Sequence, residues 1–166
     1  MPPTLNFWRS FLRWRSGRGF GIHSPFAYRF VTEVLHQPCA FYAYDRLSPQ
    51  PQVRLMVRLM AAFQPRRVAL VECGGLLRQA VRMADSRVPV SNVPEGADLI
   101  AVDCSRVSPE AVEAMLCAEP RPHALLLNCP APPQLQGYGM TFANARGTVV
   151  VASYKHLPRQ DFEVRF

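Results

Sequence analysis

The sequence predicts a three-layer α/β domain with a mostly parallel sheet. Three short apolar runs without polar alternation, at residues 67–73, 98–104 and 123–129, are typical of strands buried on both faces of such a sheet. Apolar residues at helical spacing separate these runs, at residues 76–84 and 108–117. The chain has 166 residues, the length of one ordinary domain. We therefore expect one core, with helices on both faces of the sheet.

Two helices are expected before the first strand. Ser24 and Pro25 favour a helix start, because serine caps free amides and proline is tolerated at the first helical position. This helix should cover residues 25–36, and an amphipathic pattern predicts another over residues 50–62. The other predicted strands are a weak one at residues 87–93 and a C-terminal group at residues 140–143, 147–153 and 161–166.

The first 20 residues form a basic and aromatic segment. Trp8, Phe11 and Leu12 recur at helical spacing among Arg9 and Arg13, which predicts an amphipathic helix. Its apolar face either docks on the domain or contacts an acidic membrane surface or nucleic acid, and we favour docking. Residues 1–65 are accordingly interpreted as a helical N-terminal extension packed on a core of residues 66–166, within one structural domain.

The net charge of +7 allows acidic partners, namely nucleic acid, anionic membranes or phosphorylated ligands. It is equally consistent with a compositional bias, because Lys155 is the single lysine among 19 Lys and Arg residues. The five cysteines are odd in number and show no C-x-x-C spacing. This pattern argues against a disulfide framework and against a zinc site, and predicts a cytoplasmic protein in a reducing compartment.

Motifs at both ends of the chain resemble one family. The stretch Gly21-Ile22-His23-Ser24-Pro25-Phe26 and the later Phe41-Tyr42-Ala43-Tyr44 are similar to the opening of a group of bacterial class I S-adenosylmethionine-dependent methyltransferases. The ending Asp161-Phe162-Glu163-Val164-Arg165-Phe166 resembles their last strand. The resemblance implies a shortened Rossmann-like methyltransferase fold, with S-adenosylmethionine bound by Glu72, Gly74, Gly75 and Asp103. Asp103 has an alternative role, as a cap for the following helix.

The cofactor motif departs from the family pattern. Leu76, Leu77 and Arg78 follow Gly75 where the family has a further glycine, and bulky side chains crowd the space for the cofactor. The family's acidic ribose ligand after the second strand has no clear counterpart, because Glu95 is better explained as a loop residue. The substrate stays unknown. Two functions are therefore expected: a methyltransferase that binds S-adenosylmethionine weakly or not at all, or a non-catalytic relative that binds acidic partners through its basic N-terminal surface.

Two further expectations follow from the departures. Asn128-Cys129-Pro130 stands where some members carry metal-binding carboxylates, so no metal site is predicted. Residues 85–97 are too few for a strand, a helix and a third strand. One edge of the sheet should therefore end at residues 87–93, or at residues 67–73 if that weak strand is absent. An open edge needs a cover, which the N-terminal helices or a second copy of the chain would supply.

Overall fold

A computed structural model describes residues 24–37, 42–133 and 137–166. In this part of the chain the helices are α2 (Pro25–Arg29), the π-helix η1 (Phe30–Leu35), the 3-10 helix η2 (Tyr42–Arg46), α3 (Pro51–Phe63), α4 (Gly75–Ala84) and α5 (Pro109–Cys117). The strands are β1 (Val68–Val71), β2 (Val90–Ser91), β3 (Leu99–Asp103), β4 (His123–Leu127), β5 (Met140–Ala143), β6 (Val149–Ala152) and β7 (Gln160–Glu163). Every element predicted within these residues is confirmed, and η2 is an addition. The helix predicted for residues 1–20 lies outside the described residues.

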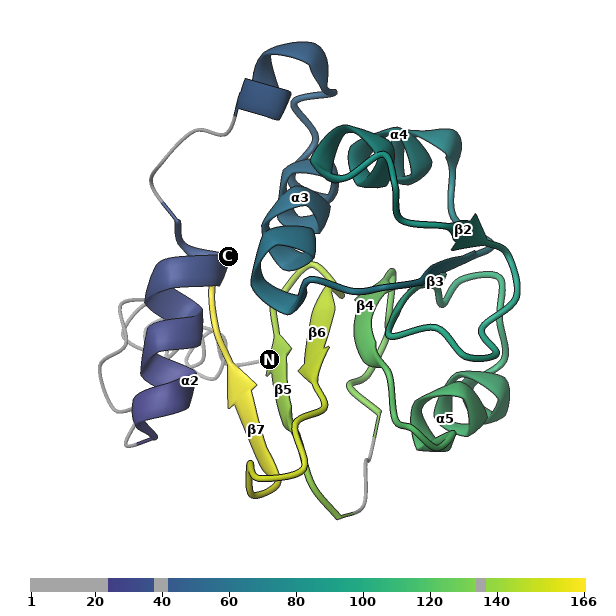
Figure 1. Ribbon diagram of the computed structural model, residues 1–166. Coiled ribbons are helices and arrows are strands. Elements are labelled where there is room, and N and C mark those ends of the chain that lie inside the picture. The colour runs from purple at the N-terminus through teal and green to yellow at the C-terminus, as the bar shows by residue number, and fades with distance from the viewer. Residues whose placement is uncertain (1–23, 38–41, 134–136) are drawn as a thin grey trace, which may run out of the picture.

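The described strands form one mixed sheet in the order β2-β1-β3-β4-β6-β5-β7 (Figure 1). Strands β1 to β4 run parallel, whereas β6 is antiparallel to both β4 and β5, and β7 is parallel to β5. The N-terminal half of the sheet thus confirms the parallel arrangement expected from the unalternating apolar runs. The C-terminal strands extend it through the antiparallel strand β6.

The sheet lies between two apolar layers, because successive side chains of a strand point to opposite faces. Leu70 of β1 packs in the cluster formed with α2, η1, α3 and α4, while Ala69 packs in the cluster formed with α5. On the first face, the Phe30 ring stacks on Phe142 of β5 at 4.8 Å and on Phe63 of α3 at 5.7 Å. The elements α2, η1 and α3 therefore share one hydrophobic core with the sheet, and the expected three-layer α/β architecture is present.

The connection between β2 and β3 is short, as the sequence predicts. Residues 85–97 contain β2 and no helix, so β2 forms one edge of the described sheet and β7 forms the other. Pro89 and Pro94 flank β2, and β7 carries Asp161 and Glu163. Short, proline-flanked or charged edge strands resist pairing with another chain. Self-association through an open edge thus stays a prediction.

Asp98 aligns the amino ends of three parallel strands. Its Oδ2 accepts hydrogen bonds from the backbone N–H groups of Arg66 (2.8 Å) and Arg67 (3.0 Å), which precede β1. Its backbone N–H donates to the Arg67 carbonyl (3.0 Å), and its carbonyl accepts from the N–H of His123 at the start of β4 (2.8 Å). One residue therefore ties the starts of β1, β3 and β4 together. The carboxyl ends of these strands lie side by side at the other end of the sheet.

His123 is held in an aromatic stack at the amino end of β4. Its ring lies 3.9 Å from that of Phe63 and nearly parallel to it, and the Tyr154 ring packs at 4.6 Å. The Nδ1 atom accepts a hydrogen bond from the Ser153 N–H (3.0 Å). Burial lowers the pKa of His123 to about 4, against the opposing effect of the Asp98 charge. The fold therefore favours the neutral ring.

Lowering the pH from about 7 to about 5 should destabilise the fold through this ring. The pKa of His123 is about 4 in the folded protein and 6.5 in the absence of structure, so the unfolded chain binds more protons between these values. The contribution to stability is full above about pH 6.5 and is lost as the pH falls toward about 4. We expect a loss of at most about 2 kcal/mol between pH 7 and pH 5 in urea unfolding.

The matched variant is His123→Gln, whose side-chain oxygen can still accept from the Ser153 N–H but does not titrate. Its unfolding free energy should depend less steeply on pH over the same interval. Burial also lowers the pKa of His36, but His36 is present in both proteins and its effect cancels. An equally steep pH dependence in the variant would show that another group is responsible.

Candidate functional site

The connections that follow β1 and β3 leave the sheet in opposite directions. From β1 the chain passes through α4 to β2 on one side, and from β3 it passes through α5 to β4 on the other. Open α/β sheets bind ligands outside the carboxyl ends of their strands at such a point. Glu72 directly follows β1, Asp103 ends β3, and Asn128 directly follows β4. We call the carboxyl ends of β1, β3 and β4 the carboxyl edge of the sheet, and this edge is the candidate site.

The sequence-predicted residues Glu72, Gly74, Gly75 and Asp103 all lie at this edge. Burial, together with the negative charges of Asp103 and Glu72, raises the pKa of Cys73 to about 12. The two carboxylates therefore act on the same thiol, although they are 31 positions apart in the chain (103 − 72). The parallel pairing of β1 with β3 is what brings them together.

Asp103 has a defined structural task. Its Oδ1 accepts hydrogen bonds from the backbone N–H (3.1 Å) and the hydroxyl (2.7 Å) of Ser105, and from the Asn128 side-chain amide (2.9 Å). Partial burial opposes ionisation, but these hydrogen bonds outweigh it, and the pKa of Asp103 lies below its usual value. The alternative role of helix cap is wrong, because Ser108 caps α5 by accepting from the Ala111 N–H (3.3 Å). Asp103 instead closes the turn after β3.

Two residues at this edge adopt left-handed backbone conformations that glycine normally occupies. Glu72 has φ +55° and Asn128 has φ +52°. Asparagine tolerates this region, whereas for glutamate it costs about 1 kcal/mol. Backbone strain of this kind clusters at functional sites. The chain therefore bends sharply where it leaves β1 and β4, and both polar side chains stand at the candidate site.

The two glycines of the turn border open space. Gly74 is the N-cap of α4 and Gly75 is its first residue. A Cβ atom added to either glycine would meet no atom within 4 Å. Packing within the described protein therefore does not require glycine at these positions, and the backbone of the turn is open to an approaching group.

Arg78 closes the neighbouring part of the edge. Its Nη2 donates to the Asn92 side-chain oxygen (2.5 Å), and its Nη1 lies 3.5 Å from the Val90 carbonyl oxygen. The guanidinium of α4 is thereby fixed across the carboxyl end of β2. Leu76 of the same helix is 41% exposed beside the turn. The long side chain that sequence reasoning expected to crowd the cofactor therefore has a fixed position.

Two thiols lie at the ends of β3 and β4. Cys104 and Cys129 interact, which lowers the pKa of Cys129 to about 7 and raises that of Cys104. Both line an apolar cavity of about 370 Å³ against the proline-rich segment 130–133. Neither thiol forms a disulfide. Among the residues that the structure describes, no three His, Cys, Asp or Glu side chains are grouped to hold a metal ion.

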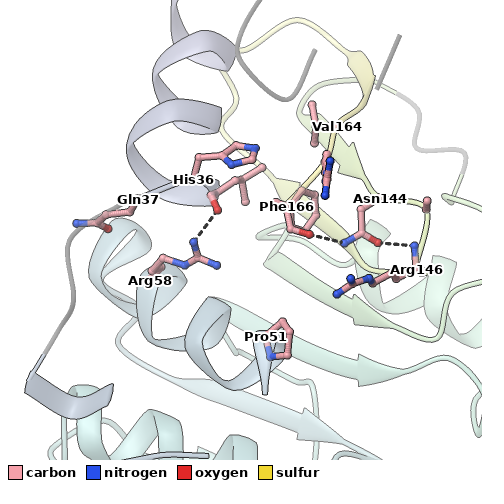
Figure 2. Close-up of a pocket in the computed structure, with 11 residues that line it drawn as sticks. His36, Gln37, Pro51, Arg58, Asn144, Arg146, Val164 and Phe166 are labelled. Atoms are coloured by element: carbon pink, nitrogen blue, oxygen red, sulfur yellow. Dashed lines mark hydrogen bonds between the residues drawn. The ribbon is translucent and has the colours of Figure 1, made fainter. Parts of the chain in front are cut away.

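Sequence reasoning missed a basic cavity farther along the same edge. This cavity of about 610 Å³ includes His36, Arg58, Asn144, Arg146, Arg165 and Phe166 in its lining, and Figure 2 shows Arg58 and Arg146 on opposite sides of it. Arg58 lies on α3, while Arg146 lies in the turn between β5 and β6. No spacing rule relates these positions, because the antiparallel strand β6 returns the turn to the end of β4.

The comparisons with known proteins add no relative. No protein-family model, no curated protein and no solved structure matches this chain. Within the described residues, none of the helices is both long and apolar enough to cross a membrane.

Replacing Glu72 by glycine tests whether the strained turn matters for stability. Glycine adopts positive φ without steric cost, so Glu72→Gly should leave the free energy of unfolding unchanged or raise it by up to about 1 kcal/mol. Glu113→Gly is the matched control, because Glu113 is an exposed residue inside α5. That substitution should cost about 1 kcal/mol. Urea unfolding of both variants gives the comparison, and a Glu72→Gly loss as large as the control would mean that the Glu72 side chain stabilises the fold.

Proposed function

We propose that this chain is an S-adenosylmethionine-dependent methyltransferase-like protein whose activity is weak or lost. Support comes first from the resemblance of its N-terminal and C-terminal motifs to class I methyltransferases. The parallel order β2-β1-β3-β4 also fits a doubly wound sheet of order 3-2-1-4-5-6 from which the third strand has been removed. In that correspondence the open turn at Gly74 and Gly75 takes the place of the glycine-rich cofactor turn.

The main support for weak or lost activity is the hydrogen bond between Arg78 and Asn92. In the family that the chain resembles, the second strand ends in an acidic residue that binds the ribose hydroxyls. Here the residues at the end of β2 are Ser91 and Asn92, and Arg78 occupies the Asn92 side-chain oxygen. The ribose half of the cofactor therefore does not fit the residues present. We derive no methyl-transfer step for this protein.

A non-catalytic binding function is the second candidate. The basic cavity favours it, because arginines from separate elements converge there on a concave surface. The basic segment at residues 1–20, which is expected to bind acidic partners, lies outside the described residues. Its contact with nucleic acid or membrane therefore stays a prediction. A binding protein needs neither a ribose ligand nor a catalytic base, so the loss of the cofactor motif does not weaken this candidate.

Calorimetric titration with S-adenosylmethionine tests the main proposal. The wild-type protein should bind with a dissociation constant well above about 1 μM, or not detectably. Arg78→Ala removes the guanidinium across the end of β2 and should strengthen binding about tenfold, a gain of about 1.4 kcal/mol. Arg82→Ala, on the same helix but outside the site, should leave binding unchanged.

Two results would contradict these expectations. A wild-type dissociation constant below about 1 μM would mean that the site still serves the cofactor. Equal effects of the two substitutions would mean that Arg78 is not the obstacle. Circular dichroism of both variants checks that each has kept the fold.

A further inference from the structure

The basic cavity has the size and lining of a small-molecule site. Its volume of about 610 Å³ lies within the range of about 300–1,000 Å³ that is usual for ligand pockets. Phe166, Pro51 and Val164 provide apolar surface, while Arg58, Arg146 and Arg165 provide positive charge. None of its described lining side chains is acidic. Such a lining matches a ligand with an anionic group at one end and an apolar part at the other.

Arg58 is fixed at the cavity wall by a hydrogen bond to the main chain. Its Nη1 donates to the Leu35 carbonyl (2.6 Å) at the end of η1, which holds the guanidinium in place. Its Nε is buried and has no hydrogen-bond partner among the described residues. Burial lowers the pKa of Arg58, but a guanidinium stays charged at neutral pH. Figure 2 shows its free end directed toward the space above Pro51.

Arg146 faces this space from a rigid turn. The Asn144 Oδ1 accepts from the backbone N–H groups of Arg146 (2.9 Å) and Thr148 (3.0 Å), and its Nδ2 donates to the main-chain oxygen of Phe166 (3.2 Å). Gly147, with φ +74°, packs so closely that a Cβ atom would lie 2.9 Å from the Cys129 carbonyl oxygen. The turn is thus anchored both to the C-terminal segment and to the end of β4. The backbone at Arg146 is therefore held in place, and its exposed side chain lines the cavity.

His36 and Arg165 complete the basic lining. Burial lowers the pKa of His36, a backbone hydrogen bond at Arg165 raises it, and the charges of Arg58 and Arg165 lower it again. Burial is the largest of these causes, and the positive charges of the two arginines act in the same direction. Glu163 lines an adjoining cavity of about 480 Å³ that also includes Arg146, and does not line the basic cavity itself.

We propose that the basic cavity binds a small molecule that carries a phosphate group, with the phosphate between Arg58 and Arg146 and the organic part against Phe166. A tetrahedral phosphate accepts hydrogen bonds from several directions, which suits guanidinium groups that approach from opposite sides, whereas one planar carboxylate pairs best with one fork. The volume of about 610 Å³ lies in the range of small-molecule sites, which favours a small molecule over a nucleic-acid strand. This assignment is independent of S-adenosylmethionine binding, because it uses α3 and the β5–β6 turn instead of the β1 turn.

The test is calorimetry with phenyl phosphate, inorganic phosphate and phenol at constant ionic strength. Phenyl phosphate should bind most tightly and phenol least, because only the first probe offers both the charge and the ring. Arg146→Gln should weaken phenyl phosphate binding about tenfold, equal to about 1.4 kcal/mol. Arg146 is exposed, so this substitution should not disturb folding. Arg58→Lys should weaken binding as well, while its ammonium can still donate to the Leu35 carbonyl.

Arg82→Gln is the control for net charge, since it removes one exposed arginine outside the cavity. It should leave binding unchanged. Absence of phenyl phosphate binding at about 1 mM, or equal weakening by Arg146→Gln and Arg82→Gln, would overturn the proposal. A single-stranded RNA and anionic phosphatidylserine vesicles are tested in parallel. If Arg146→Gln weakens binding to either while phenyl phosphate does not bind, the ligand is macromolecular and the small-molecule assignment is wrong.

Discussion

The register of the parallel strands depends on Asp98. Its carboxylate and backbone bind the residue before β1 and the first residue of β4, so three strands start level at the amino edge. Strands that start level and have similar lengths also end level. Glu72, Asp103 and Asn128 consequently stand side by side at the carboxyl edge, and each feature of the candidate site inherits its position from this alignment.

The architecture could be predicted from the sequence because strand burial and helix capping produce local sequence patterns. Continuous apolar runs identify strands covered on both faces, and Ser24 accepts from the Ala27 N–H at the helix start that Ser24-Pro25 predicts. The switch from α-helix to π-helix at Phe30 has no such local sequence pattern. It accompanies contacts from distant segments, namely the Phe142 and Phe63 rings on Phe30 and the Arg58 guanidinium on the Leu35 carbonyl.

The candidate site could be predicted only in part for the same reason. Glu72, Gly74, Gly75 and Asp103 follow strands directly, so the strand pattern alone places them at one edge. The left-handed backbone at Glu72 and the reach of Arg78 to Asn92 depend on tertiary geometry. That Arg58 and Arg146 line the same cavity is harder still to predict from the sequence. One precedes the sheet and the other lies in its antiparallel part, and they line one cavity because β6 runs antiparallel beside β4.

The carboxyl edge thus carries two regions of opposite charge. At the β1–β3 switch point the acidic groups Glu72 and Asp103 oppose ionisation of Cys73, and Arg78 covers the adjacent end of β2. Toward β6 the charge is positive and the surface concave. The described sheet ends at β2, so no further strand forms a wall beyond it. Toward β6 the cavity has walls from η1, α3 and the β5–β6 turn. Ligand binding at this edge is therefore best supported away from the switch point, where the residues are held by contacts that do not involve β2.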